Sequence, residues 1–170
     1  MDPNHPPEPW LRGTLTDVPA VPRAVLHALE LAKEDLLRWC GALTDSELNA
    51  RPAGIAPVAF HIRHIARSLD RLLTYGEGDQ LSSHQITQMK TELDTPPRRE
   101  ELFAELDAAL RTSVERIRAF DVTSLNEPRE VGQKKLPATL GGLLVHVADH
   151  TQRHVGQAIT ASKIVQAQRS

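Results

Sequence analysis

The sequence predicts an all-α protein, namely a four-helix bundle that follows an extended, proline-rich N-terminal arm. Two observations indicate the bundle. Four stretches carry apolar residues at three- and four-residue steps, and no stretch sustains the alternation typical of a strand. The length of 170 residues suits one compact domain. We therefore expect the arm over residues 1–18 and the bundle over residues 19–170.

The arm is predicted from its prolines, which fix φ, lack an N–H and so oppose a helix. The large apolar residues Trp10 and Leu11 within it are expected to dock on the domain or on a neighbouring subunit. The prolines concerned are Pro3, Pro6, Pro7, Pro9 and Pro19.

The first helix is predicted over residues 22–43, with Pro22 in a position that needs no N–H. The letters TDSE at 44–47 then indicate a capping box that starts a short helix. The second long helix is predicted over residues 57–75, and Gly76 ends it. A looser segment follows, with a short helix expected near residues 85–93.

The third long helix is predicted from TPPRREE at 95–101 to Phe120, and the fourth over residues 138–166. Residues 121–137 are expected to form a loop. The connection between the second and third helices is the longest, which allows these two helices to run parallel. The predicted order is therefore up-down-down-up.

Charge and composition exclude several classes of function. The net charge is −2 and both signs alternate along the chain, which disfavours nucleic-acid binding. No apolar run reaches the roughly 20 residues of a membrane span, and the N-terminus does not resemble a signal peptide. Cys40 is the single cysteine, so no disulfide forms within the chain. We expect a cytoplasmic protein and a small-molecule substrate.

The most informative stretch is HVADHTQRHVGQ at 146–157, which places three histidines at four-residue intervals. Because an ideal helix turns by about 100° per residue, His150 and His154 fall close to Leu143, in the middle of the apolar stripe. His146 lies on one flank of that stripe. Histidines at i and i+4 bring their rings to the same side and can bind one ion, which removes the cost of burying unpaired ring nitrogens.

A third ligand is expected from the second helix, whose FHIRHIARS stretch contains His61 and His64. On the same ideal wheel, the apolar centre of this helix falls close to Ile62. His61 lies to one side of that centre, whereas His64 lies towards the opposite face of the helix. Geometry alone therefore places His61 closer to the core.

The residues RHIARS at 63–68 and HVADHTQRHVGQ at 146–157 resemble motifs of the DinB-like superfamily, also called DinB/YfiT-like. The resemblance covers roughly residues 20–165. It implies an up-down-down-up four-helix bundle with a metal triad, of which one histidine comes from helix two and an H-x-x-x-H pair from helix four. It points to His64, His150 and His154 as the metal ligands, so it disagrees with the wheel over His64 and His61. It also implies a homodimer, because relatives often pair through helix faces.

The resemblance leaves His61 and His146 as residues that support the ligands or line the pocket. Arginines could clamp a carboxylate there. The further pocket candidates are Arg63, Arg67, Asp149, Gln152, Arg153 and Gln157.

Three neutral imidazoles suit a divalent ion, with zinc or nickel favoured, and leave a coordination position open. The resemblance implies a metal-dependent hydrolase, or a transferase that uses a low-molecular-weight thiol such as mycothiol, bacillithiol or glutathione. The catalytic group is then a metal-bound water or a thiolate. The alternative is a non-catalytic metal-binding or stress-response bundle. The substrate and the native metal stay open.

Overall fold

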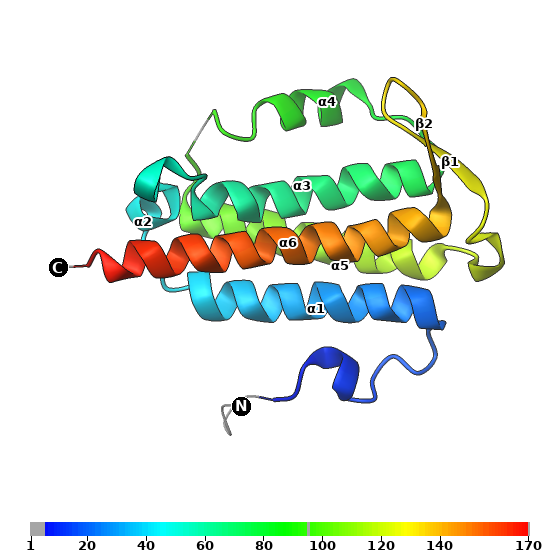
Figure 1. The fold of residues 1–170 in the computed structure, drawn as a ribbon, viewed down its shortest axis with the longest axis horizontal. Coiled ribbons are helices and arrows are strands. Elements are labelled where there is room, and N and C mark those ends of the chain that lie inside the picture. Colours follow the sequence, from blue (N-terminus) through cyan, green and yellow to red (C-terminus); the bar gives the residue numbers. More distant parts are fainter. Residues whose placement is uncertain (1–5, 95, 170) are drawn as a thin grey trace.

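The chain forms four long helices that lie side by side in the computed structural model, which describes residues 6–94 and 96–169 (Figure 1). They are α1 (Ala20–Cys40), α3 (Val58–Gly76), α5 (Arg99–Ala119) and α6 (Leu140–Ala167). Helix α6 packs against both α1 and α3, and α3 packs against α5. The prediction of a mainly helical fold is confirmed, with each long helix beginning and ending within a few residues of the expected positions, over the described part of the chain.

The ends of the helices follow from local sequence. Pro22 lies in the first turn of α1, where backbone N–H groups have no partner inside the helix. The predicted capping box is present, because Thr44 and Glu47 exchange hydrogen bonds at the start of α2 (Asp45–Asn49). The Thr139 side chain accepts a hydrogen bond from the backbone N–H of Gly142 and caps α6. At the start of α2 and of α6 a side chain therefore bonds a free backbone N–H group of the first turn. At the start of α1, Pro22 has no N–H group that would need a partner.

The connection between α5 and α6 differs from the prediction. The sequence predicts a loop over residues 121–137, but the segment contains most of an antiparallel hairpin of β1 (Pro128–Val131) and β2 (Leu136–Thr139). The turn uses Gly132 with φ near +70° and Lys135 with φ near +50°. The strands are four residues long and each contains a proline, so the sequence lacks the alternation that marks a strand. The hairpin closes one end of the helices (Figure 1).

The connection between α3 and α5 carries α4 (Ser83–Lys90), close to the short helix expected near residues 85–93. Ser82 and Gln85 form its capping box. The buried Gln85 side chain also donates to Asp70 and Thr74, which ties α4 to α3. The segment after α4 then returns along α3 and brings Glu92 into a buried position.

Of the arm expected over residues 1–18, residues 1–5 lie outside the described residues. The remainder contains a short 3-10 helix, Pro9–Leu11. Arg12 donates to Glu30 and Glu34 on α1 and so fixes this segment to the domain. Among the described residues, no helix is both long enough and apolar enough to cross a membrane.

Candidate metal centre

Three histidine side chains from two helices meet on the seam, which is the line of contact between helices α3 and α6. His64 comes from α3, and His150 and His154 come from successive turns of α6. Each offers one ring nitrogen, and these three atoms lie within 4.8 Å of one another. The ring centroids are 4.4 Å apart for His64 and His154 and 4.7 Å apart for His150 and His154. Within the described residues this is the group whose donor atoms are close enough to share one ion.

Each of the three rings has a different partner at Nδ1. His64 Nδ1 lies 2.6 Å from the Glu92 carboxylate, and His154 Nδ1 lies 3.0 Å from Nδ1 of His61. His150 Nδ1 lies 3.4 Å from the Ser68 hydroxyl oxygen. Since Ser68 already donates its proton to the Ile65 carbonyl, its oxygen is left to accept from His150. The contacts of His64 and His150 favour the tautomer with the proton on Nδ1 and the lone pair on Nε2, and the contact between His154 and His61 is satisfied in the same tautomer of His154.

The Nε2 atoms are therefore the atoms available for an ion. Those of His64 and His150 lie 3.3 Å apart. Two nitrogens that each lie about 2.0–2.1 Å from one tetrahedral zinc ion are separated by roughly 3.3 Å. The spacing of this pair fits a shared divalent ion, and the partners at Nδ1 are of the kind that orients metal-binding histidines.

His61, His150 and His154 are held in the neutral form that metal binding requires. Burial, followed by the neighbouring His64, lowers the pKa of His61 to about 4 and that of His150 to about 4. The same causes lower the pKa of His154 to about 3. Burial raises the pKa of Glu92, but the hydrogen bonds from His64 and Arg71 outweigh it and lower that pKa overall. An anionic carboxylate therefore faces the Nδ1–H of His64 at neutral pH.

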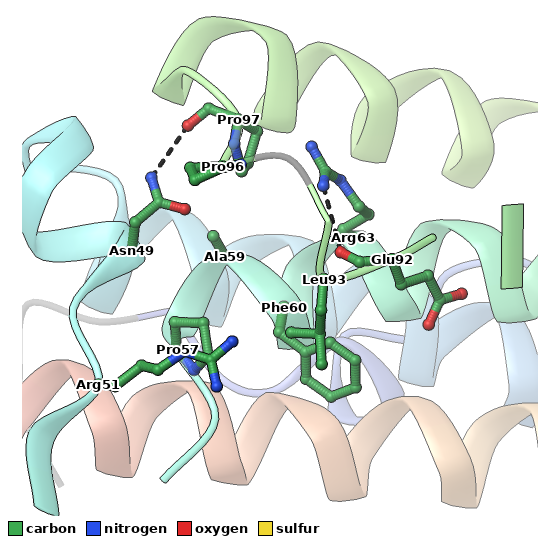
Figure 2. Close-up of a pocket in the computed structure, with 10 residues that line it drawn as sticks. All are labelled: Asn49, Arg51, Pro57, Ala59, Phe60, Arg63, Glu92, Leu93, Pro96 and Pro97. Atoms are coloured by element: carbon green, nitrogen blue, oxygen red, sulfur yellow. Dashed lines mark hydrogen bonds between the residues drawn. The ribbon is translucent and has the colours of Figure 1, made fainter. Parts of the chain in front are cut away.

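One end of the site is closed by Phe60, whose ring stacks on His64 and meets His154 edge-on. Beyond Phe60 lies a cavity of about 70 Å³, which Figure 2 shows with Arg51, Arg63 and Leu93 around it. The Arg63 guanidinium donates to the backbone oxygen of Glu92, whereas the Glu92 carboxylate points away from that cavity (Figure 2). A space of this size holds a few water molecules and no more.

His61 and His146 flank the three converging rings. His61 is 6% exposed and the side chain of His64 is 19% exposed, so His61 lies closer to the core, as the helical wheel predicts. The ring of His61 contacts Nδ1 of His154 but does not belong to the group of three. The side chain of His146 is 45% exposed and its ring centroid lies 5.4 Å from that of His150. The arrangement therefore brings His64, and not His61, into the group of three.

The remaining candidates from the sequence are mostly engaged elsewhere. Arg67 donates to Glu105 on α5 and to the backbone oxygen of Gln88. Arg63 lies 3.8 Å from Glu105 and lines the small cavity. Arg153 pairs with Asp149 along the exposed side of α6, Gln152 donates to Ala28 on α1, and Gln157 is exposed.

Three residues around the triad were not predicted from the sequence. Glu92 contacts His64 across 28 positions and lies in a segment without periodicity, so no local signal marks it. Ser68 lies within RHIARS, and a small polar residue one turn after His64 could have indicated a partner for a ring nitrogen. Phe60 precedes His61 and has the pattern of an ordinary core residue.

Comparisons with known proteins give the family and the fold. The model of the DinB superfamily matches residues 28–158. A crystal structure described as the conserved protein of a locus from Enterococcus faecalis has a TM-score of 0.68 and 24% sequence identity. The match covers 89% of this chain and 100% of that chain. At that identity the likeness shows the fold alone. No curated protein matches the chain.

Proposed function

The chain belongs to the DinB superfamily, and from that premise we propose that it is a divalent-metal-dependent enzyme whose ion is held by His64, His150 and His154. The observation that carries the proposal is the convergence of three imidazoles, each of which offers a ring nitrogen within 4.8 Å of the others and has a contact at Nδ1. Zinc and nickel are the ions that three neutral imidazoles favour. A divalent ion held in this way supplies Lewis-acid activation of water, a thiol or a carbonyl group.

The residues of the chain have separable tasks in this proposal. Glu92, Ser68 and His61 hold the three rings in one tautomer and one orientation. Phe60 covers one side of His64 and His154 and keeps water from that side. The side chain of His64 is 19% exposed, so the site is open to a small molecule from another side.

Of the two reactions that the family suggests, we favour hydrolysis over transfer to a low-molecular-weight thiol. Glutathione and bacillithiol carry carboxylates that a basic clamp would hold. Arg67 is bonded to Glu105 and Arg153 to Asp149. The basic cavity beside Phe60 has a volume of about 70 Å³, which is too small for a thiol cofactor.

Metal analysis after dialysis tests the site. We expect about one zinc or nickel ion per chain in the wild type and a loss of binding in His150→Ala. His146→Ala is the matched control, because it removes a neighbouring histidine of the same helix and should retain the ion. A wild type that binds no ion, or equal binding in the two variants, contradicts the proposed ligands.

Activity is tested on metal-loaded wild type and His150→Ala with ester and amide substrates, and with thiol acceptors in the presence of glutathione, bacillithiol or mycothiol. We expect metal-dependent hydrolysis that His150→Ala abolishes. Turnover only with a thiol supports the transferase. A protein that binds metal but turns over neither set supports the alternative, a non-catalytic metal-binding or stress-response protein.

The proposal includes the architecture around the site. We propose an up-down-down-up four-helix bundle over residues 19–170 with an N-terminal arm over residues 1–18. Its support is that α1 and α6 run in one direction in Figure 1 while α3 and α5 run in the other. A homodimer is proposed from the exposed Trp10 and Leu11 of the arm. Light scattering with and without residues 1–18 tests the dimer.

A further inference from the structure

An apolar cavity of about 690 Å³, open to solvent along one side, lies beside His146, the neighbour of His150 on α6. It is lined by Leu72 on α3, Leu143 and His146 on α6, and Val131 and Ala138 on the hairpin. Its volume falls in the range of about 300–1,000 Å³ that is typical of small-molecule sites. The hairpin that the sequence did not predict therefore forms one wall of this cavity.

The cavity and the triad occupy the same seam between α3 and α6. Leu72 lies one turn beyond Ser68, which contacts His150, and His146 lies one turn before His150 on α6. One helical turn advances about 5.4 Å. The ring of His146 lines the cavity and its centroid lies 5.4 Å from that of His150, so the two spaces are neighbours.

The chemistry of the lining restricts what fits. Among the described residues that line the cavity there is no lysine, arginine, aspartate or glutamate, and its polar side chains are those of Thr139 and His146. A charged group placed against this lining would lose part of its hydration and gain no partner of opposite charge. An apolar group would instead be removed from water.

We propose that this cavity binds the body of the substrate, and that the substrate is a small, uncharged, largely apolar molecule with a polar reacting group at the end that faces His64, His150 and His154. The inference rests on the proposed metal site, because the triad fixes which end of the molecule reacts. It adds the substrate class, which the triad alone does not define.

Hydroxamates test the inference without any known reaction, because the hydroxamate group binds zinc through two oxygens while the tail reports on the neighbouring space. The binding of three compounds to the zinc-loaded protein is measured by calorimetry. They are acetohydroxamate, hexanohydroxamate and the monohydroxamate of succinic acid, whose tail ends in a carboxylate. We expect hexanohydroxamate to bind on the order of 100-fold more tightly than acetohydroxamate, and the succinic compound to show no gain.

Val131→Asp places a charge in the cavity wall and should abolish the preference for the apolar tail. The matched control is Leu136→Asp, because Leu136 pairs with Val131 in the hairpin but is 57% exposed and does not line the cavity. This control should keep the preference. If Val131→Asp unfolds, Ala138→Asp on the other strand takes its place.

The outcomes separate the two proposals. Equal binding of the three compounds to the zinc-loaded wild type, or an unchanged preference in folded Val131→Asp, overturns the apolar substrate site and leaves the metal site standing. A wild type that binds neither zinc nor nickel overturns the proposed function, and this inference with it.

Discussion

The carboxylate of Glu92 lies 2.6 Å from Nδ1 of His64, and Arg71 donates to its other oxygen at 2.7 Å. Glu92 is 6% exposed and belongs to the segment between α4 and α5, whereas His64 and Arg71 belong to α3. A buried carboxylate thus joins a connecting segment to the histidine proposed as the ligand from α3. This arrangement orients the ring and raises its basicity toward an ion.

Glu92→Gln should weaken zinc binding by about 10–100-fold, because the loss of a partner behind a metal-binding histidine typically has that effect. The measurement is competition with a chromophoric chelator, together with the visible spectrum of the cobalt-loaded protein. A distorted cobalt spectrum shows a changed ligand arrangement rather than a general loss of stability. Glu105→Gln is the control, since Glu105 pairs with Arg67 and not with a histidine. Equal affinity in the wild type and Glu92→Gln contradicts this role.

The metal-free protein should lose stability as the pH falls from about 6.5 to about 4. The pKa values of His61 and His150 are about 4 and that of His154 is about 3, all below the ordinary value of 6.5, mainly because burial disfavours the charged ring. Below about pH 6.5 the unfolded chain therefore binds more protons than the folded one, and the free energy of unfolding decreases.

Urea unfolding at several pH values checks this pH dependence. A double variant, His150→Gln with His154→Gln, should show a shallower dependence on pH than the wild type. His84→Gln, which changes an exposed histidine on α4, should keep the wild-type dependence. A free energy of unfolding that stays constant over this pH range is incompatible with the lowered pKa values.

Arg12→Ala should release the segment before α1. Arg12 donates to Glu34 through two bonds of 2.7 Å and to Glu30 at 3.1 Å. Cleavage by chymotrypsin near Trp10 should become several-fold faster, while the melting temperature changes little, because such exposed ion pairs contribute little to stability. Arg98→Ala, which removes a different exposed ion pair, serves as the control. Unchanged cleavage in Arg12→Ala means that other contacts hold the arm.

Cys40 should react only when the protein unfolds. Its side chain is fully buried, and burial raises the pKa of the thiol to about 11 even though a hydrogen bond with Ser162 opposes the shift. Iodoacetamide at pH 8 should therefore modify the native protein far more slowly than the protein in urea, since the thiolate is the reactive form. Equal rates by mass spectrometry would place this thiol at the surface.

The sequence predicts the long helices well, because each of them buries apolar residues at three- and four-residue steps. Leu36 on α1, Ile62 on α3 and Leu144 on α6 are almost completely buried, as expected of a core face. The hairpin was not predicted from the sequence, because its strands are only four residues long and contain Pro128 and Pro137. Its formation depends on contacts with the helices, such as the bond from Arg129 to the backbone oxygen of Gly76.

The part of the candidate site that lies on a single helix could be predicted from the sequence. The four-residue spacing places His150 and His154 on one face of α6 regardless of the rest of the fold. The partner from α3 was harder to choose, because the wheel ranks residues by depth in the core, where His61 lies deeper. The three rings meet at the seam between two helices, which a wheel of one helix does not describe. Glu92 depends on the path of a connecting segment and could not be predicted from local pattern.

The most direct test is a crystal structure of the zinc-loaded protein with anomalous diffraction measured at the zinc edge. We expect one strong peak on the seam between α3 and α6, bound by Nε2 of His64, His150 and His154. A peak bound by His61 or His146 in place of any of these three, or no peak on this seam, contradicts the proposed centre.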